Sequence, residues 1–214
     1  MPRSEVSNQQ VREERRQQIR SSALRLFAEN GLAATKMSDI AADVGISQGL
    51  FYHYYPSKEA LFTELIEHAF TTLNTAARGL EQLALPPAEK VILAVKELLR
   101  GLEEHADTGP TYLLIAQATA SAATPEAAKA IIQRENRTPY DVMARIFRAG
   151  QAEGTIKPFD PDQLALVFWT SMTGLAIYKA AHGAEFRAPE ADILLNLFLT
   201  RESISAPDQA AVTP

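Results

Sequence analysis

The stretch GISQGLFYHYYPSKEALF, residues 45–62, decides the fold class of the first part of this chain. Gly45 is suited to a tight turn, Ser47 is a common helix N-cap, and Pro56 cannot continue a helix. The sequence therefore predicts a short helix over residues 48–54, after which Ser57 caps a new one. Either Leu50 or Phe51 must face inward, because so small a helix needs an apolar anchor.

Two helices are expected before this stretch. In residues 9–30 apolar side chains recur at helical spacing, and Gly31 follows as a stop signal. Thr35 is expected to cap a second, shorter helix that runs through Val44 and ends at Gly45.

The rest of the chain continues the helical pattern and carries no strand signal, so the predicted fold class is all-α. Apolar periodicity and proline starts place further helices at 57–80, 86–107, 111–122, 126–153, 161–178 and 189–198. The segment 126–153 is either two helices or one helix kinked at Pro139, and we favour the kink. Residues 163–178 hold no charge, which predicts a fully buried helix.

Composition limits the function classes. The 214 residues contain no cysteine, which excludes disulfides and thiolate zinc sites and suits a reducing compartment. No secretory-signal pattern or membrane span is expected, so we expect a cytoplasmic protein with no membrane partner. Residues 1–60 hold eight Lys and Arg against seven Asp and Glu, whereas residues 61–214 hold thirteen against nineteen. An anionic partner would therefore meet the first part, where Arg12, Arg15, Arg16 and Arg20 cluster, although a solvated helix face explains that cluster almost as well.

A short helix, a Gly-Ile-Ser turn and a second short helix match the helix-turn-helix motif. The second helix of this motif lies in the DNA major groove and reaches base edges with its N-terminal part. Gln48, Gly49, Tyr52 and His53 are expected to face outward, and glutamine can bond adenine with both the oxygen and the nitrogen of its side-chain amide. Phe51 and Tyr55 are expected to form the small domain's core.

The run LFAENGLAATKMSDIAADVGISQGLFYHYYPSKEALFTEL, residues 26–65, resembles the N-terminal domain of the TetR family of bacterial transcriptional regulators. The resemblance is carried by Phe27 with Gly31, Thr35, Ile40-Ala41, Gly45-Ile46-Ser47, the Tyr52/Tyr54/Tyr55 cluster, and Lys58 with Leu61. It covers about forty residues at fixed spacing, and the remaining chain agrees only in being helical and of suitable length.

The resemblance implies base or sugar contacts from Gln48, Gly49, Tyr52 and His53. It implies phosphate contacts from Thr35, Lys36, Ser47, Tyr54 and Lys58. Leu50 departs from the family pattern, which often has a small or hydroxylated residue there, so either a phosphate contact is missing or Leu50 touches a thymine methyl.

The resemblance also implies a DNA-binding domain over 9–56, a ligand-binding and dimerisation domain over 57–201, and loose tails at 1–8 and 202–214. The implied function is a repressor that a small molecule releases from a palindromic operator. The expected homodimer contacts are Phe168, Gly174, Leu175, Leu194, Leu197 and Phe198. Tyr112, Gln117, Trp169, Met172, Thr173 and Tyr178 are the expected ligand contacts, since they combine apolar surface with a few polar groups.

Two other function classes stay open. An enzyme is disfavoured, because the four histidines lack metal-ligand spacing and no catalytic or nucleotide-binding fingerprint occurs. Glu64 and His68 share a helical face without further ligands, so no metal site, catalytic residue or cofactor is expected. A helical ligand-binding protein without operator-specific DNA binding is harder to separate from a repressor.

Overall fold

The computed structural model describes residues 3–204 of the chain and the side chains of residues 9–203. Helices account for the regular structure of this range, which contains a single isolated β-bridge pair, Ile156 with Leu199, and no strand. The all-α prediction is confirmed. The chain divides into two compact units, each described by itself below.

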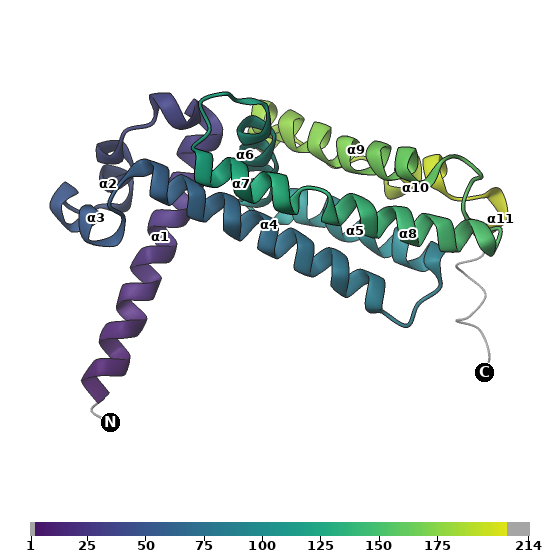
Figure 1. The fold of residues 1–214 in the computed structure, drawn as a ribbon, viewed down its shortest axis with the longest axis horizontal. Coiled ribbons are helices and arrows are strands. Elements are labelled where there is room, and N and C mark those ends of the chain that lie inside the picture. The colour runs from purple at the N-terminus through teal and green to yellow at the C-terminus, as the bar shows by residue number, and fades with distance from the viewer. Residues whose placement is uncertain (1–2, 205–214) are drawn as a thin grey trace. The chain divides into compact units, whose positions relative to one another are not determined.

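The first unit comprises residues up to Ala69 together with Pro110–Gln133. Its helices are α1 (Arg3–Ala34), α2 (Met37–Val44), α3 (Gln48–Tyr54), the first half of α4 (Lys58–Gln82), and most of α6 (Thr108–Ala120) and α7 (Glu126–Glu135) (Figure 1). Its core includes Ile19, Phe27, Ile40, Phe51 and Leu61, none of which is exposed to solvent.

The second unit comprises Phe70–Gly109 and the residues from Arg134 onward. It contains the end of α4, α5 (Pro87–Glu104), α8 (Thr138–Ala152), α9 (Pro161–His182), the 3-10 turn η1 (Gly183–Glu185), α10 (Ala191–Phe198) and α11 (Arg201–Ile204). Helices α8 and α9 run side by side (Figure 1). Three buried rings join them to α10, with centroids 6.4 Å apart for Phe147 and Phe168, 5.3 Å for Phe147 and Phe198, and 5.8 Å for Phe168 and Phe198.

Several predicted helix ends are confirmed by their hydrogen bonds. The Ser47 hydroxyl accepts the Leu50 N–H at 3.2 Å, the Ser57 hydroxyl accepts the Ala60 N–H at 3.1 Å, and the Asp160 carboxylate accepts the Gln163 N–H at 2.9 Å. Gly31 interrupts α1 with φ 77° and ψ 163°, a conformation that side chains with a Cβ rarely adopt.

Three sequence predictions about helix extent are wrong. Residues 3–8, expected as a loose tail, belong to α1, while the outer ends of both tails, 1–2 and 205–214, lie outside the described residues. Residues 126–153 form two helices, because Pro139 lies in the first turn of α8, where its missing N–H costs no helical hydrogen bond. Helix α9, whose residues 163–178 carry no charge, is buried on one face only, since Leu166, Val167, Ile177 and Tyr178 are exposed.

The two units also divide the chain differently from the expected boundary between residues 56 and 57. The first unit continues to Ala69 and recruits Pro110–Gln133, so α4 supplies residues to both units. A sequence boundary placed at a proline could not anticipate this, because the shared helix has no break.

One glycine of the second unit provides a test of its packing. A Cβ added at Gly150 would lie 2.2 Å from Cγ1 of Ile156 and 3.2 Å from Cβ of Pro87. We expect Gly150→Ala to lower the free energy of unfolding by about 1–3 kcal/mol, the usual cost of overpacking a core. Urea unfolding followed by circular dichroism measures the change.

Gly79→Ala is the matched control, because nothing lies within 4 Å of the added Cβ at that exposed helical position. It should stabilise the protein by up to about 1 kcal/mol, the difference in helix propensity between alanine and glycine. Equal effects at the two positions would contradict the packing described for Gly150.

Candidate nucleic-acid interface

The turn between α2 and α3 is fixed by backbone hydrogen bonds. Gly45 ends α2 in the left-handed region, with φ 71° and ψ 35°, and its N–H bonds to the carbonyls of Ala41 and Ala42. The Ile46 N–H donates to the Ala41 carbonyl at 2.9 Å, and Ser47 then caps α3. This arrangement is the predicted helix-turn-helix, and the positive φ explains why glycine suits position 45.

Helix α3 buries one face and exposes the other. Phe51 is fully buried and Tyr55 is 2% exposed, with ring centroids 6.2 Å apart, so Phe51 is the inward anchor that the sequence had left open between two residues. The opposite face carries five of the residues predicted to contact DNA, namely Gln48, Gly49, Leu50, Tyr52 and His53, and all of them are exposed.

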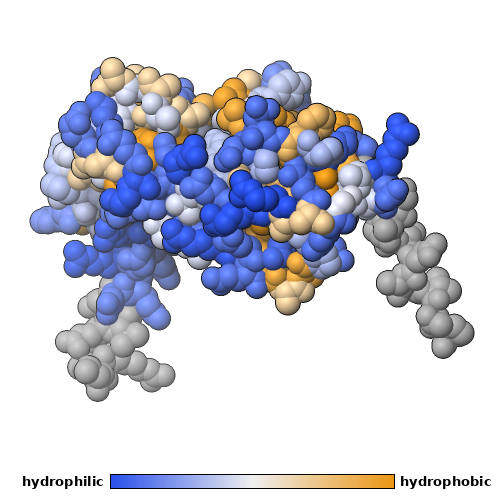
Figure 2. Space-filling model, turned by 45° about the vertical axis from the view of Figure 1, so that its right-hand side comes forward, coloured by the Kyte–Doolittle hydropathy of each residue, from blue (hydrophilic) through white to orange (hydrophobic). Residues whose placement is uncertain are grey.

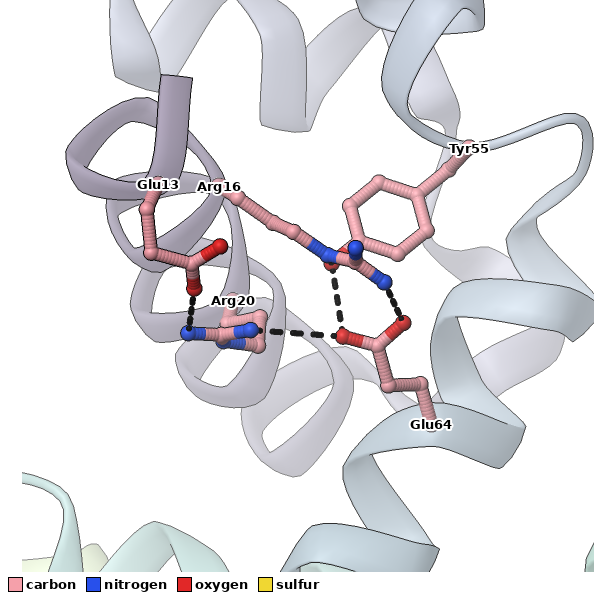
Figure 3. A network of polar contacts seen from close by, with 5 residues as sticks. All are labelled: Glu13, Arg16, Arg20, Tyr55 and Glu64. Atoms are coloured by element: carbon pink, nitrogen blue, oxygen red, sulfur yellow. Dashed lines mark hydrogen bonds and ion pairs between the residues drawn. The ribbon is translucent and has the colours of Figure 1, made fainter. Parts of the chain in front are cut away.

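A polar network fixes α3 through the residue that follows it (Figure 3). Glu64 on α4 accepts from Arg16 at 2.5 Å, from the Tyr55 hydroxyl at 3.0 Å and from Arg20 at 3.5 Å. Arg16 also donates to the Tyr55 oxygen at 3.2 Å and lies over its ring, and Arg20 donates to Glu13 at 2.9 Å. The network therefore joins α1, the end of α3 and α4.

The network changes the proton affinities of its members. Partial burial by itself would raise the pKa of Glu64, but the hydrogen bonds from Arg16, Tyr55 and Arg20 together outweigh it and lower that pKa. Burial raises the pKa of Tyr55 to about 12. At neutral pH the Glu64 carboxylate is therefore surrounded by a neutral phenol and two guanidinium groups.

These contacts revise the interpretation of the arginine cluster on α1. Arg16 and Arg20 are paired with Glu64 and Glu13, and Arg25 is paired with Asp43 at 2.7 Å. Much of the positive charge of the first unit is therefore neutralised within the protein.

Two residues predicted to contact phosphate instead form hydrogen bonds to backbone carbonyls inside the first unit. Thr35 is 2% exposed, and its hydroxyl donates to the carbonyls of Gly31 at 2.8 Å and Leu26 at 3.1 Å, so it neither caps α2 nor offers that hydroxyl to a ligand. The Lys58 ammonium donates to the carbonyls of Leu32 at 2.9 Å, Ala33 at 3.2 Å and Thr35 at 3.3 Å. All three of its N–H groups therefore stabilise the end of α1.

The other residues predicted to contact phosphate are at least partly accessible to solvent. Lys36 and Ser47 are exposed, and Tyr54 is half-buried at the end of α3. Their contact with DNA stays a prediction.

The predicted ligand contacts do not form one group. Trp169 and Met172 are buried on α9 and Thr173 is half-buried beside them, whereas Tyr178, nine positions after Trp169, lies about half a turn away and is exposed. Tyr178 stacks on His182, with ring centroids 3.8 Å apart. Tyr112 and Gln117 belong to the first unit, where Gln117 donates to the Ala28 carbonyl at 2.9 Å.

The predicted dimer contacts also separate into two sets. Phe168 and Phe198 are fully buried and Leu194 is 8% exposed, so these three side chains pack inside their own unit and offer no surface to a second chain. Gly174 and Leu197 are exposed and Leu175 is half-buried. The face of the molecule in Figure 2 shows apolar surface gathered in patches between polar regions.

Among the described residues, no group of three or more His, Asp or Glu side chains could hold a metal ion. The Glu64 carboxylate, which shares a helical face with His68, is engaged by Arg16, Tyr55 and Arg20.

Residues 19–65 match the family model for bacterial regulatory proteins of the tetR family. Over these residues the chain is similar to the TetR family. The match covers the second half of α1, the helix-turn-helix and the start of α4, which are the elements that carry the resemblance in the sequence.

The chain is similar to an uncharacterised helix-turn-helix transcriptional regulator of Bacillus subtilis, YerO, with 31% identity over 96 residues, 44% of this chain. The match spans only 33% of the length of YerO. The transcriptional repressor KstR2 of Mycobacterium tuberculosis is 26% identical over 144 residues, which cover 67% of this chain and 70% of KstR2.

Solved structures agree in fold. The MbdR regulator from Azoarcus sp. CIB has a TM-score of 0.73 at 20% identity, covering 85% of this chain and 95% of its own. AibR in complex with isovaleryl coenzyme A and operator DNA has a TM-score of 0.64 at 18% identity, covering 85% and 94%. At these identities the likeness establishes the fold alone: an N-terminal helix-turn-helix domain followed by a helical domain.

The sequence interpretation missed the residues that fix the position of α3 on its buried side. Glu64 was considered only with His68, on the same helical face, and not with α1. The arginines of α1 offered a signal, because three of them recur at helical spacing and a buried or half-buried carboxylate on another helix would pair with them.

The network makes Glu64 a test of how the first unit is held together. We expect Glu64→Gln to lower the free energy of unfolding by about 1–3 kcal/mol at pH 7, because hydrogen bonds between charged groups are lost and Arg16 loses its carboxylate. Since the folded pKa of Glu64 is lowered, its contribution is present above the ordinary glutamate pKa of about 4.3 and is lost as pH falls through the folded value. Thermal unfolding of both proteins from pH 7 to pH 3 should thus converge.

Glu67→Gln, which changes an exposed carboxylate one turn along the same helix, is the control and should leave unfolding nearly unchanged. A constant difference between wild type and Glu64→Gln across this pH range would contradict the network's charge state.

Proposed function

We propose that this chain is a transcriptional repressor that binds a palindromic operator as a homodimer and leaves it when a small-molecule ligand binds. The observation that carries the proposal is the outward face of α3, where five exposed residues stand on a helix held by Gly45, Ser47 and the Glu64 network. The match of residues 19–65 to the tetR family model supports it, as does the similarity to KstR2, a transcriptional repressor.

In this proposal α3 enters the major groove. Gln48 offers the oxygen and the nitrogen of its side-chain amide to a base edge, and Tyr52 and His53 supply further donors. Leu50, which is 42% exposed, is placed to meet a thymine methyl, the second of the two possibilities that the sequence left open. Lys36, Ser47 and Tyr54 would bond phosphates, which orient the domain without reading sequence.

The exposed apolar face of α9 and α10 supports the homodimer. On α9, Leu166, Thr170, Gly174 and Ile177 fall at helical spacing and are exposed, and nothing lies within 4 Å of a Cβ added at Gly174. Ile193 and Leu197 are exposed on α10, which the contact of Phe168 with Phe198 places beside α9. A second copy that brings the same face would bury both.

The segment Pro161–Glu185 is also long and apolar enough to cross a membrane by length and composition, a test that core helices of soluble proteins pass as well. We favour the dimer, because one face of α9 already packs on α8 through Phe168 and because α9 carries Asp162, Lys179 and His182. A cytoplasmic location without a membrane partner belongs to this proposal.

Release by a ligand requires that the ligand favour a conformation that DNA does not accept. Moving the equilibrium from 99:1 to 1:99 takes about 5.5 kcal/mol of differential affinity. AibR, in its structure with isovaleryl coenzyme A and operator DNA, is a protein of this fold with both kinds of partner. Trp169, Met172 and Thr173 are the ligand contacts that we retain from the sequence prediction, because they lie together on α9.

Binding to the DNA upstream of the chain's own gene tests the proposal. We expect specific binding by fluorescence anisotropy, with Gln48→Ala losing about 1–3 kcal/mol of discrimination at one or two base pairs per half-site. Lys36→Met should weaken binding to all sequences alike and reduce the salt slope by about one, since it removes one phosphate contact.

Lys96→Met, which changes an exposed lysine of α5, should alter neither quantity. Failure to bind the upstream DNA at low salt would favour the alternative of a helical ligand-binding protein without operator recognition. Turnover of a bound compound would favour an enzyme.

The dimer face generates a separate prediction. Ile177→Glu and Leu197→Glu place a charge at the centre of the exposed apolar face, so each should shift the protein from dimer to monomer in sedimentation equilibrium. Phe159→Glu changes a side chain that is 60% exposed in the loop before α9, and it should leave the dimer intact. A monomeric wild type at micromolar concentration would rule out this interface.

A further inference from the structure

Two buried polar atoms of the second unit lack hydrogen-bond partners. They are Oδ1 of Asn74 on α4 and Nε1 of Trp169 on α9, and no other buried side-chain nitrogen or oxygen in the described residues is left unpaired. Asn74 is 3% exposed and Trp169 is 6% exposed. Such atoms are rare in folded proteins, because each gives up hydrogen bonds to water without replacing them.

Both residues lie beside the segment where α8 begins. Nδ2 of Asn74 donates to the Glu135 carboxylate at 2.9 Å and to its carbonyl at 3.3 Å, just before α8 begins. Tyr140, in the first turn of α8, lies with its ring centroid 6.2 Å from that of Trp169. The start of α8 is therefore flanked by α4 through Asn74 and by α9 through Trp169.

The orientation of the Asn74 amide is determined by its neighbour. An ionised carboxylate only accepts hydrogen bonds, so the NH₂ group must face Glu135 and Oδ1 must be the unpaired atom. The indole N–H of Trp169 can only donate. The unpaired pair thus consists of one acceptor and one donor.

The surroundings of these atoms are mainly apolar. Met172, one turn after Trp169, is fully buried, and the Phe168 ring meets the Trp169 ring edge-on with centroids 5.1 Å apart. Burial raises the pKa of Tyr140, so the phenol is neutral. The Glu135 carboxylate that accepts from Asn74 is already compensated by Arg134, at 2.7 Å, and by the charge of Arg78, so it requires no charged ligand.

We propose that Asn74, Tyr140 and Trp169 recognise an uncharged, mainly apolar ligand that carries both a hydroxyl and a carbonyl group. The hydroxyl donates to Oδ1 of Asn74, and the carbonyl accepts from Nε1 of Trp169. The inference rests on the proposed function in so far as this ligand is the one that releases DNA. It adds Asn74 and Tyr140 to the ligand contacts, and neither was predicted from the sequence.

A series of four related compounds tests the ligand class on the unmodified protein. The compounds are 4-(hydroxymethyl)benzophenone, benzophenone, which lacks the hydroxyl, 4-benzylbenzyl alcohol, which lacks the carbonyl, and the anionic 4-benzoylbenzoate. Trp169 is the only tryptophan of the chain, so its fluorescence reports on this site, and calorimetry gives the affinities. We expect the hydroxyketone to bind about ten-fold or more tightly than each compound that lacks one group, since a buried partner is then left unpaired.

Two variants test the residues. Asn74→Leu should abolish only the advantage of the hydroxyketone over benzophenone. Trp169→Phe should abolish only its advantage over 4-benzylbenzyl alcohol. Gln163→Leu, which removes an exposed amide from α9, should preserve both advantages. The proposal is wrong if the hydroxyketone has no advantage in the wild type, or if it keeps both advantages in the two variants. Either result would mean that Oδ1 of Asn74 and Nε1 of Trp169 bind only water. Because the four-compound comparison needs no variant, a misfolded Asn74→Leu protein does not prevent the test.

Failure of this inference can be separated from failure of the proposed function. Release of upstream DNA by a compound that binds Asn74→Leu and Trp169→Phe as tightly as wild type would overturn the inference and keep the repressor. Tight, group-dependent binding of the hydroxyketone to a protein that does not bind its upstream DNA would keep the inference and overturn the repressor.

Discussion

The carboxylate of Glu64 holds together the segments that orient α3. It accepts from Arg16 and Arg20 of α1 and from the hydroxyl of Tyr55, the residue directly after α3. A helix of seven residues cannot hold its own direction in solution, so α3 depends on the buried Phe51 ring and on this network. The same carboxylate that stabilises the first unit therefore also determines which side chains face outward.

This use of charge affects how the interface can bind DNA. Arg16, Arg20, Arg25 and Lys58 all bond within the first unit, so their positive charge is compensated or engaged before any ligand arrives. The outward face of α3 then offers mainly uncharged donors, acceptors and aromatic rings. A surface of this kind gains less from counterion release and relies more on base edges, which favours specificity over non-specific affinity.

The sequence was sufficient where a local rule decides the structure. The positive φ of Gly45 and the caps at Ser47, Ser57 and Asp160 follow from residue type and position. It was insufficient where distant segments decide. Thr35 has the right type for a cap, but the carbonyl of Leu26 competes for its hydroxyl, and Lys58 is drawn to the exposed carbonyls that end α1. Leu26 lies nine positions from Thr35 and Leu32 lies 26 positions from Lys58, and only the Gly31 carbonyl, four positions before Thr35, is a local competitor.

The second unit illustrates a different limit. An uncharged run such as residues 163–178 predicts burial on all sides, but α9 packs one face in its own unit and leaves the other exposed, which is the pattern expected if the proposed second copy covers that face. A polar residue inside an apolar stripe carries a related signal. Ile66, Phe70, Asn74 and Ala77 follow one another on the buried side of α4, and only Asn74 can form hydrogen bonds there. Because apolar residues would pack at that position without an unpaired oxygen, the asparagine costs stability, and a ligand that donates to Oδ1 would recover that cost only when bound. Since α4 also carries Glu64, the residues that hold α3 and the proposed ligand site share one helix.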